Sequence, residues 1–272
     1  MNSLVKLIAP TLLLAGCASL DADQQAQTQD GAYEVSEVHG PSPTVVFEAG
    51  LGAYKEEWRK IFPVVAATHA AFAYDRPGVG RSEATTRPRD GATIVEDLRR
   101  LLRARGFAPP FVLVGHSAGG LDMQLFARLH PQEVAGLVLV DPTHPAQFIG
   151  EGAMDKRPLL SQFVVAAVMT RAAKAEFAAL DQTGREALAA PPPPADMPIM
   201  ILIAPDVSGD RLAIIDNAKR ADFARLYPHA TLRAVAGGHN IPGNDPQAVL
   251  DAIAEVLAHK STAANALGAT RP

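Results

Sequence analysis

The chain has 272 residues, and 25 lysines and arginines against 29 aspartates and glutamates give it a formal charge of −4 near neutral pH. This weak acidity indicates no nucleic acid partner. The single cysteine excludes an intramolecular disulfide and any zinc site built on cysteine pairs. No H-E-x-x-H motif or aspartate-rich cluster occurs, so neither a metal nor another cofactor is expected.

The first sixteen residues have the pattern of an export signal. Lys6 supplies a positive charge, a mostly apolar run extends from Leu7 to Ala15, and Leu14-Ala15-Gly16-Cys17 ends it. The run is too short to span a bilayer as a mature helix. It resembles a bacterial lipoprotein signal peptide, in which the cysteine becomes an acylated N-terminus. The resemblance implies a signal peptide at 1–16, lipidation of Cys17 and anchoring to a membrane of the cell envelope, at its periplasmic or outer face. The alternative is an ordinary secretory signal.

The remaining chain divides by composition. Residues 17–31 contain four glutamines and are predicted to form a polar tether. Residues 32–260 are enough for one large α/β domain. Residues 261–272 lack an apolar period and are expected to be a frayed tail.

Short apolar runs alternate with helical segments through this domain. Most runs are continuous, which is typical of parallel strands covered on both faces, so we expect a mostly parallel, doubly wound sheet with an antiparallel edge at Tyr33–Val38. The predicted parallel strands are Thr44–Phe47, Ala71–Tyr74, Phe111–Val114, Leu137–Val140, Ile199–Ala204 and Thr231–Val235. The predicted helices are Glu56–Ala66, Thr93–Arg105, Ala118–Leu129, Arg211–Leu226 and Pro246–Ala258.

One connection breaks this alternation. Almost sixty residues without a convincing strand separate Val140 from Ile199, and they include alanine-rich helical pieces such as Arg171–Leu180. An insertion of this length is typical of a helical cap. We therefore predict a cap at about 143–196, before the penultimate strand.

A glycine-flanked serine follows one of the predicted strands. The motif Gly115-His116-Ser117-Ala118-Gly119 comes directly after Phe111–Val114 and opens a helical pattern. Such an elbow lifts the hydroxyl out of the sheet, where a base can reach it. Ser117 is therefore predicted to be a nucleophile. The alternative is a glycine-rich turn with an incidental serine.

A serine nucleophile needs a base, and His239 is the best candidate among the eight histidines. It lies in a glycine-rich loop past the last predicted strand, at the edge where open α/β sheets bind ligands. His116 adjoins the serine but is expected to point elsewhere. Capping or solvation is expected for the histidines near helix ends, which are His130, His229 and His259.

These motifs resemble the α/β-hydrolase superfamily of serine hydrolases. The resemblance covers roughly Thr44–His259 outside the cap, and its motifs are Phe47–Gly52, Tyr74–Ser82, Gly115–Gly119 and Gly238-His239. It implies the α/β-hydrolase fold and the chain order nucleophile, acid, histidine.

The resemblance also implies two backbone donors for an oxyanion, the N–H groups of Leu51 and Ala118. Many members have His-Gly where this chain has Glu48-Ala49-Gly50. Because the donor is a backbone group, this change need not remove it. A flexible turn at the end of a strand is the alternative interpretation.

Three carboxylates compete for the role of the acid. The usual position in the family follows Ile199–Ala204, where Asp206 and Asp210 are available, and a minority position ends the preceding strand at Asp141. Asp141 is favoured because it directly follows its strand, while the later loop is irregular. Asp206 and Asp210 stay open, as does a turn-capping role for Asp141.

The pattern predicts a carboxylesterase-like hydrolase that cleaves a small-molecule ester through an acyl-serine intermediate. Amide or peptide cleavage and a non-catalytic, lipid-tethered binding protein are the alternatives. Haloalkane dehalogenases and epoxide hydrolases of this superfamily have aspartate at the elbow, whereas position 117 is serine. An acyl pocket is possible in the cap, although packing of its helices is the expected use of its apolar side chains, Phe148, Phe163, Met169 and Phe177.

Overall fold

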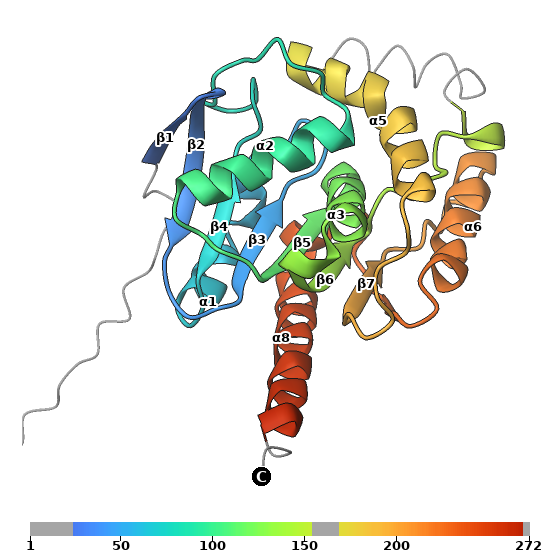
Figure 1. Cartoon of the computed structure of the whole chain (residues 1–272). Helices are drawn as coiled ribbons and strands as arrows, with labels where there is room; N and C mark the ends of the chain where they lie inside the picture. The colour runs from blue at the N-terminus through green and yellow to red at the C-terminus, as the bar shows by residue number, and fades with distance from the viewer. Residues whose placement is uncertain (1–23, 154–168, 269–272) are drawn as a thin grey trace, which may run out of the picture.

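The structure, a computed structural model, describes residues 24–153 and 169–268, so the predicted signal peptide, Cys17 and Phe163 lie outside it. Eight strands of the described part form one sheet in the order β1-β2-β4-β3-β5-β6-β7-β8 (Figure 1). The strands from β3 to β8 are parallel, and β2 pairs antiparallel with β4. The predicted parallel sheet and the antiparallel pairing of Tyr33–Val38 are therefore confirmed, but the prediction that this strand is the edge is wrong, because β1 pairs with its outer side.

The strand bounds lie close to the predicted runs. The strands are β1 (Gln24–Thr28), β2 (Gly31–Val38), β3 (Thr44–Glu48), β4 (Ala71–Tyr74), β5 (Phe111–His116), β6 (Val134–Val140), β7 (Ile199–Ile203) and β8 (Thr231–Ala234). The α-helices are α1 (Phe62–Ala66), α2 (Gly91–Ala104), α3 (Ser117–Leu129), α5 (Arg171–Ala189), α6 (Arg211–Leu226), α7 (Ile241–Asn244) and α8 (Pro246–Gly268). Short 3-10 helices are η1 (Lys55–Trp58), η2 (Pro131–Glu133) and η3 (Gly150–Gly152).

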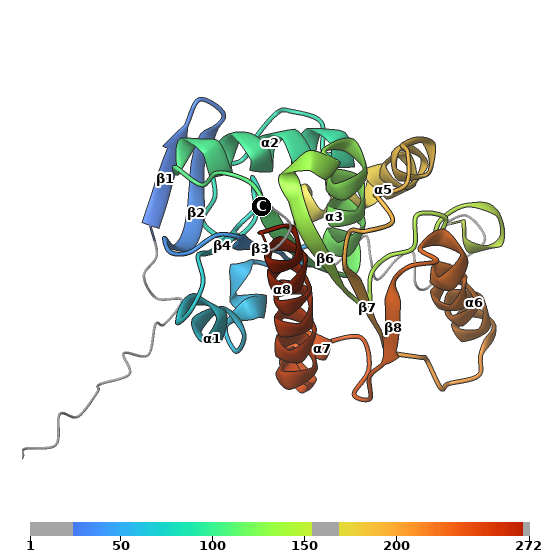
Figure 2. The same cartoon turned by 60° about the horizontal axis from the view of Figure 1, so that its bottom comes forward.

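Helices cover both faces of the sheet, as continuous apolar strands require. On one face α2 and α3 bury leucines such as Leu98 and Leu121 against the sheet. On the other, Trp58 of η1, Phe62 of α1 and Ile253 of α8 form a second apolar layer. Figure 2 shows α8 on the face opposite α2. The strand ends that carry the candidate site are thus held between two packed layers.

Three predicted segments differ from the structure. Part of the predicted tether, Gln24–Thr28, is strand β1, because an edge strand can expose its glutamines while Ala26 is fully buried. The predicted helix Glu56–Ala66 is divided into η1 and α1, and Pro63 lies in the first turn of α1. The predicted frayed tail is in part helical, because α8 continues to Gly268.

The long connection between β6 and β7 contains α5, which extends the predicted helical piece Arg171–Leu180 to Ala189. Its N-cap is Thr170, whose side chain accepts a hydrogen bond from the Ala173 N–H. The helix packs on α2 and α3. Within 24–153 and 169–268, no helix is both long and apolar enough to cross a membrane.

Candidate active site

Ser117 sits at a strained junction between β5 and α3. Its φ is +52°, in the left-handed region that residues other than glycine rarely adopt. Close packing holds the turn: a Cβ added to Gly119 would lie 2.4 Å from the Ala49 carbonyl oxygen, and one on Gly115 would lie 2.6 Å from the Gly119 carbonyl oxygen. The glycines thus allow β5, α3 and the loop after β3 to meet, as a nucleophile elbow requires.

The structure brings the predicted nucleophile, base and favoured acid into one hydrogen-bonded chain. Ser117 Oγ lies 3.0 Å from His239 Nε2, and His239 Nδ1 lies 2.6 Å from Asp141 Oδ2. An ionised carboxylate only accepts hydrogen bonds, so Nδ1 of a neutral His239 carries the proton and Nε2 accepts from the serine hydroxyl. This tautomer is the one that can take the serine proton.

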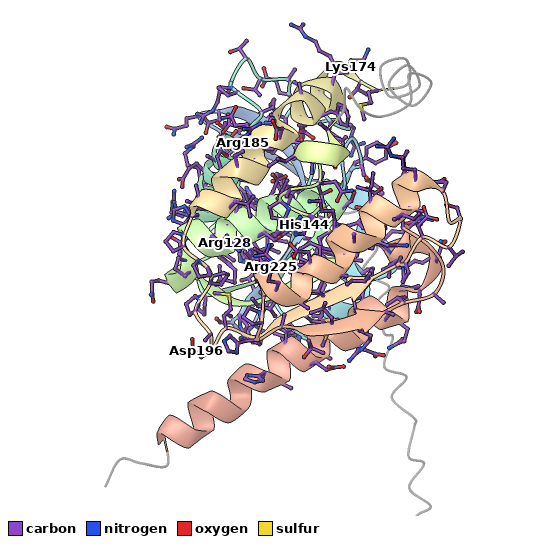
Figure 3. The ribbon with its side chains drawn as sticks, turned by 90° about the vertical axis from the view of Figure 1, so that its right-hand side faces the viewer. Arg128, His144, Lys174, Arg185, Asp196 and Arg225 are labelled. Atoms are coloured by element: carbon purple, nitrogen blue, oxygen red, sulfur yellow. The ribbon has the colours of Figure 1, made fainter. Side chains whose placement is uncertain are left out.

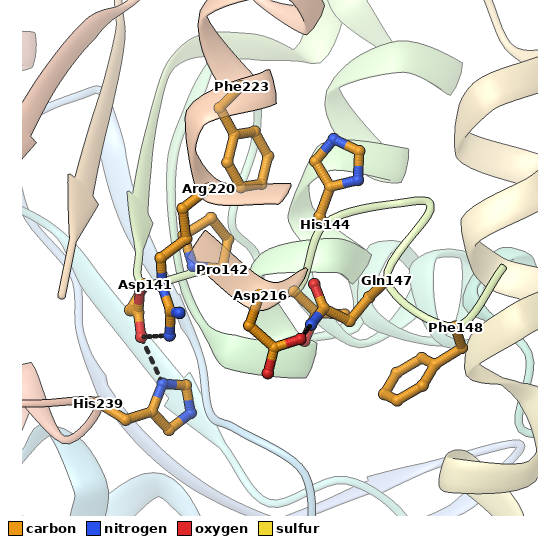
Figure 4. A pocket seen from close by; sticks show the side chains of 10 residues that line it. Asp141, Pro142, His144, Gln147, Phe148, Asp216, Arg220, Phe223 and His239 are labelled. Atoms are coloured by element: carbon orange, nitrogen blue, oxygen red, sulfur yellow. Dashed lines mark hydrogen bonds and ion pairs between the residues drawn. The ribbon is translucent and has the colours of Figure 1, made fainter. Parts of the chain in front are cut away.

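Asp141 is held by donors from three directions. Besides His239, Arg220 donates at 2.9 and 3.1 Å and the Ala204 N–H donates at 3.1 Å (Figure 4). Burial alone would raise the pKa of Asp141, but the bonds from His239 and Arg220 outweigh it and lower the pKa to about 2. The carboxylate is therefore ionised at every pH at which the protein is expected to work.

The other two candidate acids make different contacts. Asp210 caps α6, accepting from the Ala213 N–H at 2.9 Å, and Asp206 accepts from the Ser208 N–H at 2.8 Å. Of the three candidates, Asp141 is the one bonded to His239.

The loop after β3 lies beside the elbow. A Cβ added to Gly50 would stand 3.5 Å from Ser117 Cβ, so the backbone leading into Leu51 passes close to the serine. Ala118 belongs to the first turn of α3. The two N–H groups predicted to bind an oxyanion therefore come from segments that meet at Ser117.

Two residues beside the hydrogen-bonded Ser117, His239 and Asp141 were not predicted to belong to the site. His116 does not point to solvent: its Nδ1 lies 2.8 Å from Glu57 Oε1 and its Nε2 lies 2.9 Å from the carbonyl oxygen of His239. Glu57 Oε2 accepts from the Gly50 N–H at 2.9 Å. A glutamate in a helical pattern gives no sequence signal for such a contact.

A buried ionic cluster connects the loop after β3 to α5. Arg76 donates to Glu48 at 2.5 Å, to the carbonyl oxygens of Ala49 at 2.8 Å and Gly50 at 2.7 Å, and to Glu176 at 3.0 Å. Glu176, on α5, also accepts from Arg89 at 2.6 Å. Glu48 is thus the partner of an arginine that fixes the loop.

A cavity of about 240 Å³ opens beside Asp141 and His239 (Figure 4). Its wall contains Phe148 from the predicted cap, together with the hydrogen-bonded pair Gln147 and Asp216. Phe177 instead packs on Phe148, with ring centroids 5.8 Å apart. No group of three or more histidine, cysteine or carboxylate side chains in the described segments is arranged to hold a metal ion.

A family model described as alpha/beta hydrolase fold matches residues 43–168. The chain is 34% identical over 121 residues to the uncharacterized protein YqjL of Bacillus subtilis, covering 44% of this chain and 48% of that protein. It is 32% identical over 105 residues to a putative carbamate hydrolase RutD of Azorhizobium caulinodans, covering 39% of each chain. Both matches therefore span less than half of these relatives.

A longer match is to the magnesium-chelatase 30 kDa subunit of Rhodobacter capsulatus, with 31% identity over 241 residues, 74% of this chain and 83% of that protein. An α/β-hydrolase fold protein of Burkholderia ambifaria aligns with a TM-score of 0.64 and 21% identity, covering 86% of this chain and 98% of that one. A Nitrososphaera gargenis structure from a study of carboxylesterases aligns with a TM-score of 0.61 and 17% identity, covering 88% and 99%. By fold, family match and relatives, this chain belongs to the α/β-hydrolase superfamily.

Proposed function

We propose that the chain is a serine hydrolase that cleaves carboxylic esters. The observation that carries this proposal is the hydrogen-bonded chain from Ser117 Oγ through His239 to Asp141, with distances of 3.0 and 2.6 Å. The Nitrososphaera gargenis structure from a study of carboxylesterases has the same fold, and at 17% identity its likeness supports the fold alone.

We infer the reaction from the proposed roles of these groups. As Ser117 Oγ attacks the ester carbonyl carbon, its proton passes to His239 Nε2, and the Leu51 and Ala118 N–H groups stabilise the negative oxygen of the tetrahedral intermediate. The intermediate collapses when His239 gives that proton to the departing alcohol. Water then attacks the acyl-serine with His239 as base, which releases the carboxylic acid and restores Ser117.

Removing the nucleophile tests the proposal. Ser117→Ala should lower the hydrolysis of p-nitrophenyl esters by purified protein at least about 10³-fold, because no acyl-serine can form. Turnover by the alanine variant equal to that of wild type would rule Ser117 out.

Amide and carbamate cleavage are the second candidates within this chemistry. The relatives named putative carbamate hydrolases favour testing them. An ester and an amide of one acyl group, with a carbamate of the same alcohol as the ester, separate the three, since ester and amide then differ in the leaving group and ester and carbamate in the carbonyl. We expect the ester to be the fastest. A faster amide or carbamate would reassign the substrate class.

Export and lipid anchoring complete the proposal. We propose that Cys17 is acylated and tethers the enzyme to a membrane of the cell envelope, from the lipobox-like run Leu14-Ala15-Gly16-Cys17. Wild type should partition with membranes, and Cys17→Ala should shift toward the soluble fraction. Equal partitioning of the two would contradict anchoring through this cysteine.

A further inference from the structure

A second set of hydrogen bonds surrounds His116 and shares no side chain with the bonds that link Ser117, His239 and Asp141. His116 directly precedes the proposed nucleophile. Its Nδ1 lies 2.8 Å from Glu57, its Nε2 lies 2.9 Å from the His239 carbonyl oxygen, and Glu57 lies 2.9 Å from the Gly50 nitrogen. These three bonds connect Glu57 of η1, the Gly50 N–H in the loop after β3, and the backbone carbonyl of His239. The segment 50–57, the end of β5 and the loop at His239 lie far apart in the sequence and are therefore joined through Glu57 and His116.

The partners of His116 limit the proton arrangements that make both of its bonds. Nδ1 faces a carboxylate and Nε2 faces a carbonyl oxygen, and both of these groups accept hydrogen bonds. A neutral imidazole carries a single N–H, so both bonds are made either by an imidazolium beside an ionised Glu57 or by a neutral imidazole with its proton on Nε2 that accepts from a protonated Glu57. Burial lowers the pKa of His116, but the hydrogen bond and charge of Glu57 outweigh it and leave the pKa raised. The pKa of Glu57 is lowered by its bond to His116 against the effect of burial, so both pKa shifts favour the ion pair, whose side chains are 6% and 13% exposed.

The pair touches the backbone at two places that matter to the proposed chemistry. Gly50 precedes Leu51, the proposed oxyanion donor, and the bonded carbonyl belongs to His239, the proposed base. The ring centroids of His116 and His239 lie 4.7 Å apart, so the two rings pack against each other. A shift of about 1 Å in reacting groups can cost about 10²-fold in rate.

We propose that Glu57 and His116 are positioning residues, a buried pair that fixes the backbone of Gly50 and of His239 on either side of Ser117. The proposal rests on the proposed function, because it assigns the pair to that nucleophile and that base. The pair acts through its hydrogen bonds to the backbone.

Two substitutions of Glu57 test this role. Glu57→Gln can keep all three bonds: its amide oxygen accepts from Gly50, its amide N–H donates to a neutral His116, and His116 still donates to the His239 carbonyl. Glu57→Met has similar size but loses the bonds to the Gly50 N–H and to His116 Nδ1, so His116 keeps only its bond to the His239 carbonyl. We expect kcat within about threefold of wild type for the glutamine variant and at least about tenfold lower for the methionine variant, with KM changed less than about threefold in both.

The rate at which a fluorophosphonate labels Ser117 separates the two proposals, because it needs the activated serine but no particular ester. An unlabelled wild type would overturn the proposed function and this inference with it. A labelled wild type matched in rate by folded Glu57→Met would overturn the positioning role alone. A glutamine variant as slow as the methionine variant would also overturn it, since the bonds would then be present without effect.

Controls keep the result specific. Glu133 pairs with Arg99 away from the site, so Glu133→Met should label at the wild-type rate. If Glu57→Met does not fold, His116→Asn takes its place, since it keeps a donor for Glu57 and loses the donor to the His239 carbonyl. It should label at least about tenfold more slowly than wild type, and a wild-type rate would overturn the proposal.

Discussion

Asp141 combines burial, strain and charge in one residue. Its φ is +37°, and its carboxylate is nearly inaccessible yet receives bonds from His239, Arg220 and the Ala204 N–H. An aspartate tolerates this backbone conformation better than most residues. The surrounding donors keep it ionised, and an ionised acceptor is what holds His239 in the tautomer that can accept the serine proton.

Asp141→Asn should therefore lower kcat on an ester by about 10³-fold or more, because an amide can favour the wrong tautomer of His239. Asp206→Asn and Asp210→Asn should stay within about threefold of wild type, since their side chains bond elsewhere. Steady-state kinetics of the three variants checks this. A large loss in Asp210→Asn with little change in Asp141→Asn would transfer the acid role.

The pKa of about 2 also fixes a pH dependence. Because the folded-state pKa lies below the ordinary value of 3.8, the stabilisation from Asp141 is fully present above about pH 4 and is lost as the pH falls toward 2. Protonation of Asp141 should therefore contribute nothing to any loss of activity above about pH 4. The pH–rate profiles of wild type and Asp141→Asn check this. If wild type lost activity with a pKa near neutrality, and Asp141→Asn kept its kcat without that loss, Asp141 would be the titrating group and this assignment would be wrong.

At the scale of elements, the position of α5 depends on a buried charge cluster. Glu176 accepts from Arg76 and Arg89, and its own side chain is 4% exposed. Glu176→Ala should lower the free energy of unfolding by about 3–5 kcal/mol, because buried Arg89 loses its carboxylate partner and buried Arg76 loses one of its two. Urea unfolding measures this.

Asp181→Ala is the matched control on the same helix. Asp181 pairs with Arg185 where both side chains are exposed, so its loss should cost less than about 1 kcal/mol. Equal effects of the two variants would show that the cluster does not hold α5.

Close packing at the elbow gives a second prediction at this scale. Gly119→Ala would place a methyl group 2.4 Å from the Ala49 carbonyl oxygen, so the loop after β3 must move. We expect kcat at least about tenfold lower. Gly91→Ala is the control, because its Cβ would meet Thr183 Cγ2 at 2.3 Å, a similar crowding between α2 and α5. Similar stability losses with activity lost only in Gly119→Ala would support the account, whereas equal kcat values would contradict it.

The sequence predicted those parts of the structure that a local residue pattern determines. Continuous apolar strands predicted the parallel sheet, and the elbow motif together with the glycine-rich loop at His239 predicted two of the residues that meet. The acid was harder, because three aspartates follow strand ends. Arg220, Glu57 and Glu176 could not be predicted, since each occupies an ordinary helical position and gains its contacts only through tertiary packing.

At the scale of the whole molecule, His144 links stability to pH. It lies beside α6 (Figure 3), with its ring centroid 4.9 Å from that of Phe223. Its Nδ1 accepts from the Ala146 N–H, and its Nε2 lies 3.2 Å from Asp222 without hydrogen-bond alignment. Burial therefore dominates over the charge of Asp222 and lowers the pKa of His144 to about 4 from an ordinary 6.5.

A folded-state pKa below the unfolded one means that the unfolded chain binds the proton first, so stability falls as the pH drops from about 6.5 to about 4. At about pH 4.5 the loss from His144 should be about 2–3 kcal/mol. His144→Asn keeps an acceptor for the Ala146 N–H and cannot titrate. Urea unfolding at about pH 7 and 4.5 should show a smaller loss in the variant, and equal losses would remove His144 as the cause.

The central claim is that His239 and Asp141 activate Ser117 as a nucleophile. Intact-protein mass spectrometry after treatment with a fluorophosphonate tests it most directly, because the serine oxygen displaces fluoride and keeps the phosphonyl group. Wild type should gain one phosphonyl group, located at Ser117 by peptide mapping, and Ser117→Ala should gain none. Folded wild type that stays unlabelled, or an alanine variant labelled as fast as wild type, would contradict the account.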